Sequence, residues 1–138
     1  MKKLGLDLGS KTLGIAISDA LGIMAHSVET FTFKTEHYKR AVDYVVKLVK
    51  KENISTIVLG HPLNMNGTEG ERAIRSRSFA KKVEEATGVR VVLWDERLTT
   101  LQVERVLIDS GMRRENRKKH TDKLAATIIL QNYLDNRG

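Results

Sequence analysis

An acidic residue stands inside an apolar stretch that runs directly into a glycine-rich turn. Over residues 4–9, leucines alternate with Gly5, Asp7 and Gly9, so in an extended strand Asp7 points away from the leucine face. Because burying a lone carboxylate costs free energy, a partner, a cation or a water-filled cleft is expected beside it. Small residues recur at the same period over residues 14–18, which leaves room for a ligand. The alternative is a polar strand end next to a turn.

Two further acidic residues, Asp95 and Glu96, follow the apolar stretch 90–94. In open sheets with helical crossovers, ligands gather at the carboxyl ends of strands. If the strand stays extended, the two side chains point to opposite sides, so only one of them shares a face with Asp7. The alternative is a solvated loop at the end of the strand.

A third candidate, Asp122, lies in a predicted helix on one face with Ala125, Ala126 and Ile129. This stripe is small enough to approach a sheet closely. With Thr121 as N-cap, Asp122 would be the first helical residue, where the helix dipole favours an acid whatever its function.

One acid in a strand, one at a strand exit and one on a helix could converge on a single point. The chain has no cysteine and four histidines, so such a site would be rich in oxygen ligands and would suit Mg²⁺ or Mn²⁺. Two such ions about 4 Å apart activate water and stabilise the leaving oxygen in phosphodiester cleavage. They also reverse the local field that would repel a nucleic acid.

The net charge of +7 and the pI near 9.8 make a polyanion the first partner to consider. Residues 111–120 form a strongly basic stretch, predicted to be a mobile loop that contacts phosphates; the alternative is a solvated loop. Arg97 has two expected roles: it binds a substrate phosphate, or it forms an ion pair with an acidic side chain. The candidates for backbone contacts are Lys11, Arg97, Arg113, Arg114, Arg117, Lys118 and Lys119.

Hydrophobic periodicity predicts the elements that hold these residues. Strands are expected at 3–9, 12–19, 23–33, 54–59 and 89–94, and helices at 35–51, 71–87, 99–110 and 122–135. The order β-β-β-α-β-α-β-α, followed by the helix at 122–135, predicts an α/β fold, a mixed five-stranded sheet with helices on both faces. Residues 1–138 are expected to form one domain. No apolar run reaches membrane-spanning length, and the lack of cysteine suits a reducing cytosol.

Four separated blocks follow the motif order of one protein family. They read DLGSKTLGIAISD at 7–19, GHPLNMNG at 60–67, DERLTT at 95–100 and DKLAATIILQ at 122–131. On these blocks the chain resembles the YqgF family, whose members are similar to Holliday-junction resolvases. The resemblance implies an RNase H-like fold and a cytoplasmic nuclease that matures the 5′ end of precursor 16S ribosomal RNA. It also implies that Asp7, Glu96 and Asp122 bind the catalytic Mg²⁺ or Mn²⁺.

Three alternatives remain at this point. Resolution of branched DNA would favour a homodimer on a two-fold junction, whereas an RNA-processing enzyme can be monomeric or dimeric. An ATP-binding module would use the glycine hairpin for phosphate, but it needs a second lobe for which 138 residues leave no room. A non-catalytic RNA-binding assembly factor would keep the fold without turnover. The chain also has Lys11-Thr12 where the family often has Lys-Arg, so one basic contact with substrate is expected to be weaker.

Overall fold

A mixed sheet of five strands carries two layers of helices. The structure, a computed structural model, describes residues 1–95 and 114–136, with the backbone alone for 114–123. In chain order the elements are β1 (Lys2–Leu8), β2 (Thr12–Ser18), β3 (Ala25–Thr32), α1 (Tyr38–Glu52), β4 (Ile54–His61), α2 (Glu71–Thr87), β5 (Arg90–Asp95) and α4 (Arg114–Asn136).

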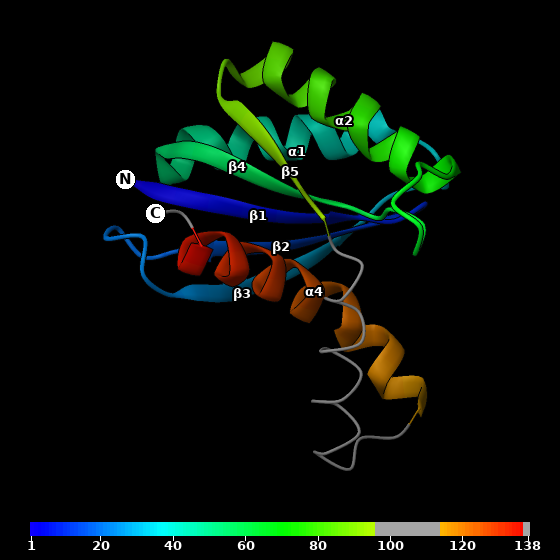
Figure 1. The fold of residues 1–138 in the computed structure, drawn as a ribbon. Coiled ribbons are helices and arrows are strands. Elements are labelled where there is room, and N and C mark those ends of the chain that lie inside the picture. Colours follow the sequence, from blue (N-terminus) through cyan, green and yellow to red (C-terminus); the bar gives the residue numbers. More distant parts are fainter. Residues whose placement is uncertain (96–113, 137–138) are drawn as a thin grey trace.

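The strand order is β3-β2-β1-β4-β5, so the hairpin strand β1 lies at the centre. β1 pairs antiparallel with β2 and parallel with β4, β2 pairs antiparallel with β3, and β4 pairs parallel with β5. Helices α1 and α2 cover one face and α4 covers the other (Figure 1). The predicted mixed sheet with helices on both faces is confirmed.

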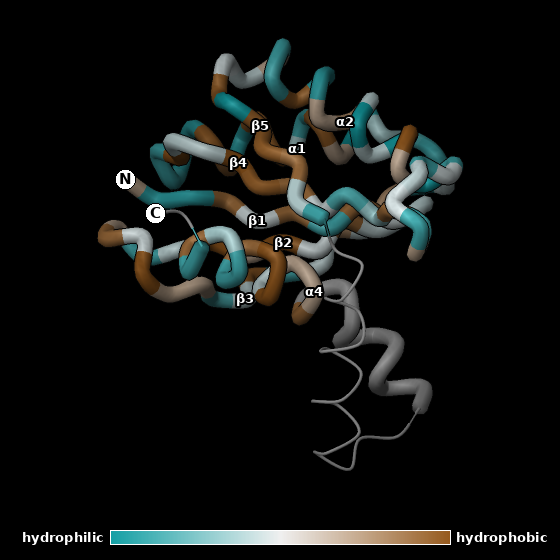
Figure 2. The backbone as a smooth tube through the Cα atoms, viewed as in Figure 1, coloured by the Kyte–Doolittle hydropathy of each residue, from teal (hydrophilic) through white to brown (hydrophobic). Residues whose placement is uncertain are grey.

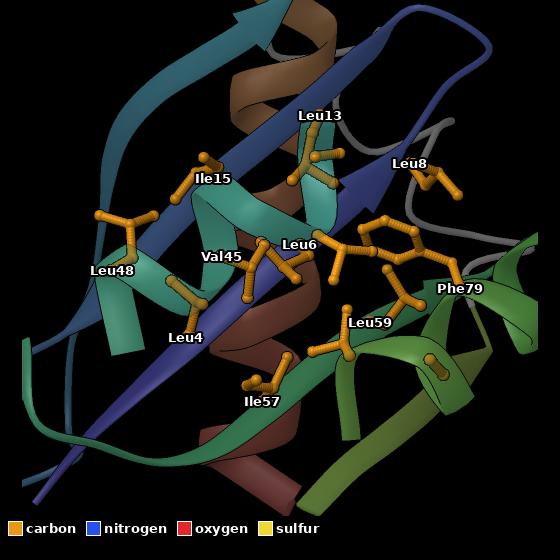
Figure 3. Packing of buried hydrophobic residues seen from close by; sticks show 14 of the residues in the cluster. Leu4, Leu6, Leu8, Leu13, Ile15, Val45, Leu48, Ile57, Leu59 and Phe79 are labelled. Carbon is orange, nitrogen blue, oxygen red and sulfur yellow. The ribbon is translucent and has the colours of Figure 1, made fainter. Parts of the chain in front are cut away.

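The leucine face of β1 packs against α1 and α2. Leu4, Leu6 and Leu8 are buried there with Leu13 and Ile15 of β2. Figure 3 shows these side chains gathered around Val45 of α1 and Phe79 of α2, with α4 behind the sheet. Each fully buried aliphatic side chain contributes roughly 1.5–3 kcal/mol, so alternation in the sequence determines which way β1 faces.

The opposite face of the sheet has small residues at its centre and receives α4. Gly5 of β1 and Ala16 of β2 are covered by Ala126 and Leu130. A Cβ added at Gly5 would lie 2.6 Å from Leu130 Cβ and 2.9 Å from the Ala126 carbonyl oxygen, so the helix approaches β1 more closely than any side chain there would allow. Figure 2 shows the apolar positions gathered on the strands and the inner part of α4.

Helix α4 runs antiparallel to β1. Near its C-terminal end, Gln131 Nε2 donates to the Ile23 carbonyl oxygen and Gln131 Oε1 accepts the Ala25 N–H, both at 2.9 Å. Ala25 pairs with Ser18, whose hydroxyl accepts the Lys3 N–H at 2.8 Å. The C-terminal end of α4 therefore lies where β1 begins, and the N-terminal part of α4 points toward the end of β1.

The start of α4 corrects the sequence-based prediction. Residues 114–120 are helical and continuous with the rest of α4, so they are not a mobile loop, Thr121 is not an N-cap and Asp122 is not the first helical residue. The stretch is polar but contains neither glycine nor proline, and Arg, Lys and Glu are good helix formers. Hydrophilicity alone therefore does not distinguish a loop from an exposed helix in this segment. The predicted helix over 99–110 lies outside the described residues.

The predicted helix over 71–87 is confirmed, and Gly88 caps its C-terminal end. Gly88 has φ +72°, and its N–H donates to the Glu84 carbonyl oxygen at 2.8 Å. In the described ranges 1–95 and 114–136, no helix combines the length and apolar character that a membrane span requires.

Asp19 organises the turn between β2 and β3. Its carboxylate accepts the Ile23 N–H at 2.8 Å, and its own N–H donates to the Met24 carbonyl oxygen at 3.1 Å. The hydrogen bond from Ile23 lowers the pKa of the Asp19 carboxyl below its ordinary value.

A pH-dependent effect on stability follows from this lowered pKa. We expect Asp19→Ala to lower the free energy of unfolding at neutral pH, because the ionised carboxylate is favoured in the folded state. The difference from the wild type should shrink as pH falls below about 4, the ordinary pKa of aspartate, and vanish once the folded carboxyl is protonated. Urea unfolding at a series of pH values measures it; a difference that is constant with pH would contradict the assignment.

Candidate active site

Asp7 lies near the carboxyl end of the central strand on the α4 face. It is half-buried and alternates with the leucines that face α1 and α2, which confirms the predicted orientation. Its partner in β2 is Gly14. On the other side, the pairing of Leu6 with Leu59 brings Gly60 of β4 beside Asp7. Both direct neighbours are glycines, so neither β2 nor β4 places a side chain directly beside Asp7.

Asp95 lies on the other face of the sheet. Trp94 packs on Tyr133 of α4 with ring centroids 5.6 Å apart, and Leu93 packs against the core on the α1 and α2 side. Asp95 follows Trp94 at the end of β5 and is exposed, so alternation directs it away from the face of Asp7. Of the two acids at this strand exit, Asp95 is therefore not the one that shares a face with Asp7.

The backbone of α4 brings Asp122 toward the same end of the sheet as Asp7. Gly5 contacts Ala126 and Leu130. Asp122 precedes Ala126 by four residues, about 6 Å along the helix, and Asp7 follows Gly5 by two residues, about 6.6 Å along the strand. Since α4 and β1 are antiparallel, both steps run in the same direction.

Several predicted residues cannot be placed in this way. Glu96, Arg97 and Arg113 lie outside the described residues. The structure gives the helical backbone, but not the side chains, of Asp122, Arg114, Arg117, Lys118 and Lys119. Within the side chains that the structure describes, no group of three or more His, Asp or Glu residues is arranged to hold a metal ion.

The turn that carries Lys11 is fixed on both sides. The Gly9 N–H donates to the Thr12 carbonyl oxygen at 2.7 Å. The carbonyl oxygens of Lys11 and Ser10 accept the N–H groups of Phe33 at 2.9 Å and Glu36 at 2.8 Å. The exposed Lys11 thus follows β1 directly on an ordered turn, at the end of the sheet where Asp7 lies. Its contact with phosphate stays a prediction.

His61 takes part in a chain of polar side-chain contacts rather than in the Asp7 site. Its Nε2 lies 2.9 Å from Glu69 Oε2, and Glu69 Oε1 lies 3.3 Å from Arg77 of α2. By alternation along β4, His61 faces α1 and α2. Arg75 pairs with Glu36 at 3.0 Å and with Glu71. These α2 arginines lie on the opposite layer from α4, where they tie the start of α2 to its surroundings.

Sequence reasoning missed two features of this site. The strand expected over 54–59 stops before Gly60, whereas β4 extends to His61 and its pairing with β1 brings Gly60 beside Asp7. The polar run over 63–70 is typical of a flexible surface loop, whereas in the structure hydrogen bonds order it. The run of Asn and Thr over 64–68, residues that bond to nearby backbone, was the available signal.

A family model described as "RuvX: Holliday junction resolvase" matches residues 1–136. The chain belongs to the RuvX family. Curated relatives named "Putative pre-16S rRNA nuclease" include proteins of Shouchella clausii and Bacillus subtilis (strain 168). The first is 48% identical over 135 residues, 98% of this chain and 95% of the relative; the second is 49% identical over 135 residues, 98% of each. The resemblance to the YqgF family is thereby confirmed.

Solved structures extend the likeness in fold. The fowlpox virus Holliday junction resolvase superposes with a TM-score of 0.60 at 14% identity, over 99% of this chain and 100% of that one. RuvC of Thermus thermophilus in complex with a Holliday junction substrate gives 0.57 at 18% identity, over 94% and 91%. At such identities the likeness concerns the fold alone, and it confirms the RNase H-like fold of this RuvX-family chain.

Proposed function

We propose that this RuvX-family protein is a cytoplasmic, divalent-metal-dependent nuclease that processes the 5′ end of precursor 16S ribosomal RNA as one domain of residues 1–138. Relatives 48% and 49% identical over nearly their whole length carry the pre-16S rRNA nuclease name, which supports a hydrolase of phosphodiester bonds. The single structural observation behind the proposal is Asp7, half-buried on a central strand between two glycines.

Asp7, Glu96 and Asp122 would hold Mg²⁺ or Mn²⁺. The donor set fits, because carboxylate oxygens are the ligands these ions prefer, and the residues that flank Asp7 on the neighbouring strands are glycines. Since Asp95 faces the other way, Glu96 is the better candidate of the two acids that end β5. The bound ions would supply an activated water and charge stabilisation for the leaving oxygen.

The remaining roles belong to the protein's basic side chains. Asp7 itself lies on β1, which is hydrogen-bonded to a neighbouring strand on each side, so the backbone at Asp7 is held in place. Lys11 and the cationic side chains at 97, 113, 114 and 117–119 would hold substrate phosphates by charge and so give affinity that does not depend on sequence. The substrate is then positioned by its backbone, while the acids and their ions carry out the cleavage.

A cleavage assay with two substrates tests the proposal. The protein is incubated with a 5′-extended 16S precursor fragment and with a four-way DNA junction, each with Mg²⁺, Mn²⁺ or a chelator. We expect metal-dependent cleavage of the RNA at its 5′ side. Junction cleavage without RNA cleavage would favour the resolvase alternative, with a homodimer measurable by analytical ultracentrifugation. RNA binding without cleavage of either substrate would favour a non-catalytic assembly factor.

Neighbouring acids provide a matched pair of variants. We expect Glu96→Gln to lower kcat by at least about 100-fold, because removing a metal ligand exceeds the 10–100-fold cost of losing an outer-shell partner. Asp95→Asn should leave kcat within a few fold, because its side chain lies on the other face of the sheet. Single-turnover cleavage measures both, and the reverse pattern would show that Asp95 is the ligand.

A further inference from the structure

Helix α1 carries a row of cations on its exposed side. Its buried residues belong to the apolar core, and by helical spacing the exposed positions share the opposite side. These positions, called the α1 stripe below, hold five cations and one carboxylate: Lys39, Arg40, Asp43, Lys47, Lys50 and Lys51. Twelve residues separate the first from the last, which is about 18 Å along the helix. This side of α1 is therefore basic over most of its length.

The charge of the α1 stripe is not neutralised within the described part of the fold. None of its five cations forms an ion pair with an acidic side chain that the structure describes. In the neighbouring helix α2, by contrast, Arg75 pairs with Glu36 and Glu71, and Arg77 pairs with Glu69. The α2 arginines thus serve contacts within the protein, whereas the cations of α1 face solvent.

The first turn of α1 has a charge distribution that does not favour the helix. The helix dipole favours acids at the N-terminus and cations at the C-terminus. Lys50 and Lys51 in the last turn follow this preference, but the first turn holds Lys39 and Arg40 and no acid, and His37 forms no side-chain cap. Solubility alone explains lysines on an exposed helix, but it does not require cations in the turn that disfavours them. An anionic partner on this side would account for them.

The α1 stripe extends along the sheet on the side away from α4. The chain enters α1 at the end of the sheet that holds Lys11, because the Phe33 and Glu36 N–H groups donate to the β1–β2 turn. It leaves α1 at the opposite end, where Lys2 Nζ lies 3.5 Å from Glu52 Oε1. Figure 1 shows α1 in the layer opposite α4. The stripe therefore begins at the end of the sheet where β1 ends and leads away from it.

The side chains of the stripe favour the backbone of a double helix as the partner. Four of the five cations are lysines, which bind phosphate as point charges and carry no sequence information in doing so. The aromatic residues of α1 are engaged within the fold: Tyr44 stacks on Phe31 with ring centroids 4.3 Å apart, and Tyr38 contacts Phe33. Single strands are commonly bound by stacking on aromatic side chains, whereas double-stranded RNA is recognised through its shape and phosphates. A straight row of lysines suits the second mode.

We infer that the α1 stripe is a second nucleic-acid contact surface, which binds the phosphates of a double-helical RNA segment flanking the cleavage site. The inference rests on the proposed function and deepens it. It names the substrate class as RNA that carries a duplex next to the cleaved strand, in preference to a short unpaired fragment. The acids proposed around Asp7 cleave the strand, and the stripe adds affinity that does not depend on sequence.

The test is a binding titration with two RNAs in the presence of a chelator, which prevents cleavage. One RNA is a single-stranded 5′ precursor fragment, and the other is the same fragment joined to a duplex longer than the stripe. We expect the duplex to tighten binding to wild type. Lys39→Gln/Lys47→Gln should lose most of this gain, and its slope of log K against log salt should be smaller by about two, one for each lost phosphate contact. Its affinity for the short fragment should equal that of wild type.

Thermal stability gives a readout that separates binding from structure. Glutamine has nearly the same helix propensity as lysine, and both lysines are exposed. Because Lys39 stands in the first turn, its loss should leave the melting temperature of Lys39→Gln/Lys47→Gln unchanged or slightly higher. Weaker duplex binding by a protein of equal or greater stability cannot come from unfolding of α1.

A matched variant on α2 controls for net charge. Lys81→Gln/Lys82→Gln also removes two exposed lysines, but Glu84 and Glu85 follow them within one turn, so it should keep the gain from the duplex. Loss of the gain in both double variants would assign it to net charge and overturn the inference. A duplex that adds nothing to wild-type binding, or a gain that Lys39→Gln/Lys47→Gln retains, would overturn it as well.

Cleavage of the same two RNAs with Mg²⁺ keeps this inference apart from the proposed function. If wild type cleaves while the titration shows no role for the stripe, the inference is wrong and the nuclease stands. If wild type cleaves neither RNA, the nuclease proposal fails, and the titration still decides whether α1 binds the duplex.

Discussion

Asp7→Asn is expected to lower the cleavage rate by at least about 100-fold while nucleic-acid binding persists or tightens. The amide keeps the size of the carboxylate but loses its charge, so it binds a divalent cation weakly, and metal-ligand losses exceed the 10–100-fold typical of outer-shell partners. Removing a negative charge from the site also lowers its repulsion of phosphate. Single-turnover cleavage gives the first quantity, and a binding titration without metal gives the second.

Asp19→Asn provides the matched control for that variant. Asp19 is an aspartate in the turn after β2, at the end of the sheet where β1 begins, so its replacement should leave the cleavage rate within about two-fold. Metal binding adds a readout independent of turnover: calorimetric titration with Mn²⁺ should show weakened binding for Asp7→Asn and unchanged binding for Asp19→Asn. Equal cleavage by Asp7→Asn and wild type would remove Asp7 from the catalytic site.

Gly5→Ala is expected to destabilise the fold by about 3 kcal/mol, at the upper end of overpacking costs. The new methyl would stand 2.6 Å from Leu130 Cβ and 2.9 Å from the backbone oxygen of Ala126, and neither atom is the end of a flexible side chain. The helix must shift away from β1, and because α4 also carries Asp122, cleavage should fall as well. Urea unfolding and single-turnover cleavage measure the two effects.

Gly88→Ala separates this packing effect from backbone strain. At Gly88 no atom lies within 4 Å of an added Cβ, but φ is +72°. The substitution should cost about 1–2 kcal/mol through the left-handed conformation, and it should leave cleavage by the folded protein unchanged because α4 stays in place. A Gly5→Ala variant as stable as wild type would show that α4 tolerates the shift and that the close approach to β1 has no structural role.

The orientation of Asp7 could be predicted because it depends on local alternation. Once the leucines of β1 face the core, the pleat directs Asp7 to the other side. The end of α2 at Gly88 also depends on local sequence, because many helices end at a glycine in the left-handed conformation. These features require no knowledge of distant parts of the chain.

The surroundings of Asp7 could not be predicted because they depend on strand register. Gly60 is more than fifty residues from Asp7 in the sequence, and only the parallel pairing of β1 with β4 brings them together. The face on which Asp95 lies likewise depends on a contact between distant parts of the chain, that of Trp94 with Tyr133 of α4. The predicted start of α4 was wrong for another reason. A polar segment without helix breakers is compatible with either a loop or an exposed helix.

Hydrogen bonds hold both Met1 and helix α4 to the β2–β3 turn, which has a consequence for engineering. The Met1 ammonium donates to the Ala20 carbonyl oxygen at 3.1 Å, and Gln131 binds Ile23 and Ala25. The beginning and the last helix of the polypeptide thus meet on the side of the sheet remote from Asp7, as Figure 1 also shows. A short linker that joins them would yield a circularly permuted chain whose acidic edge is undisturbed.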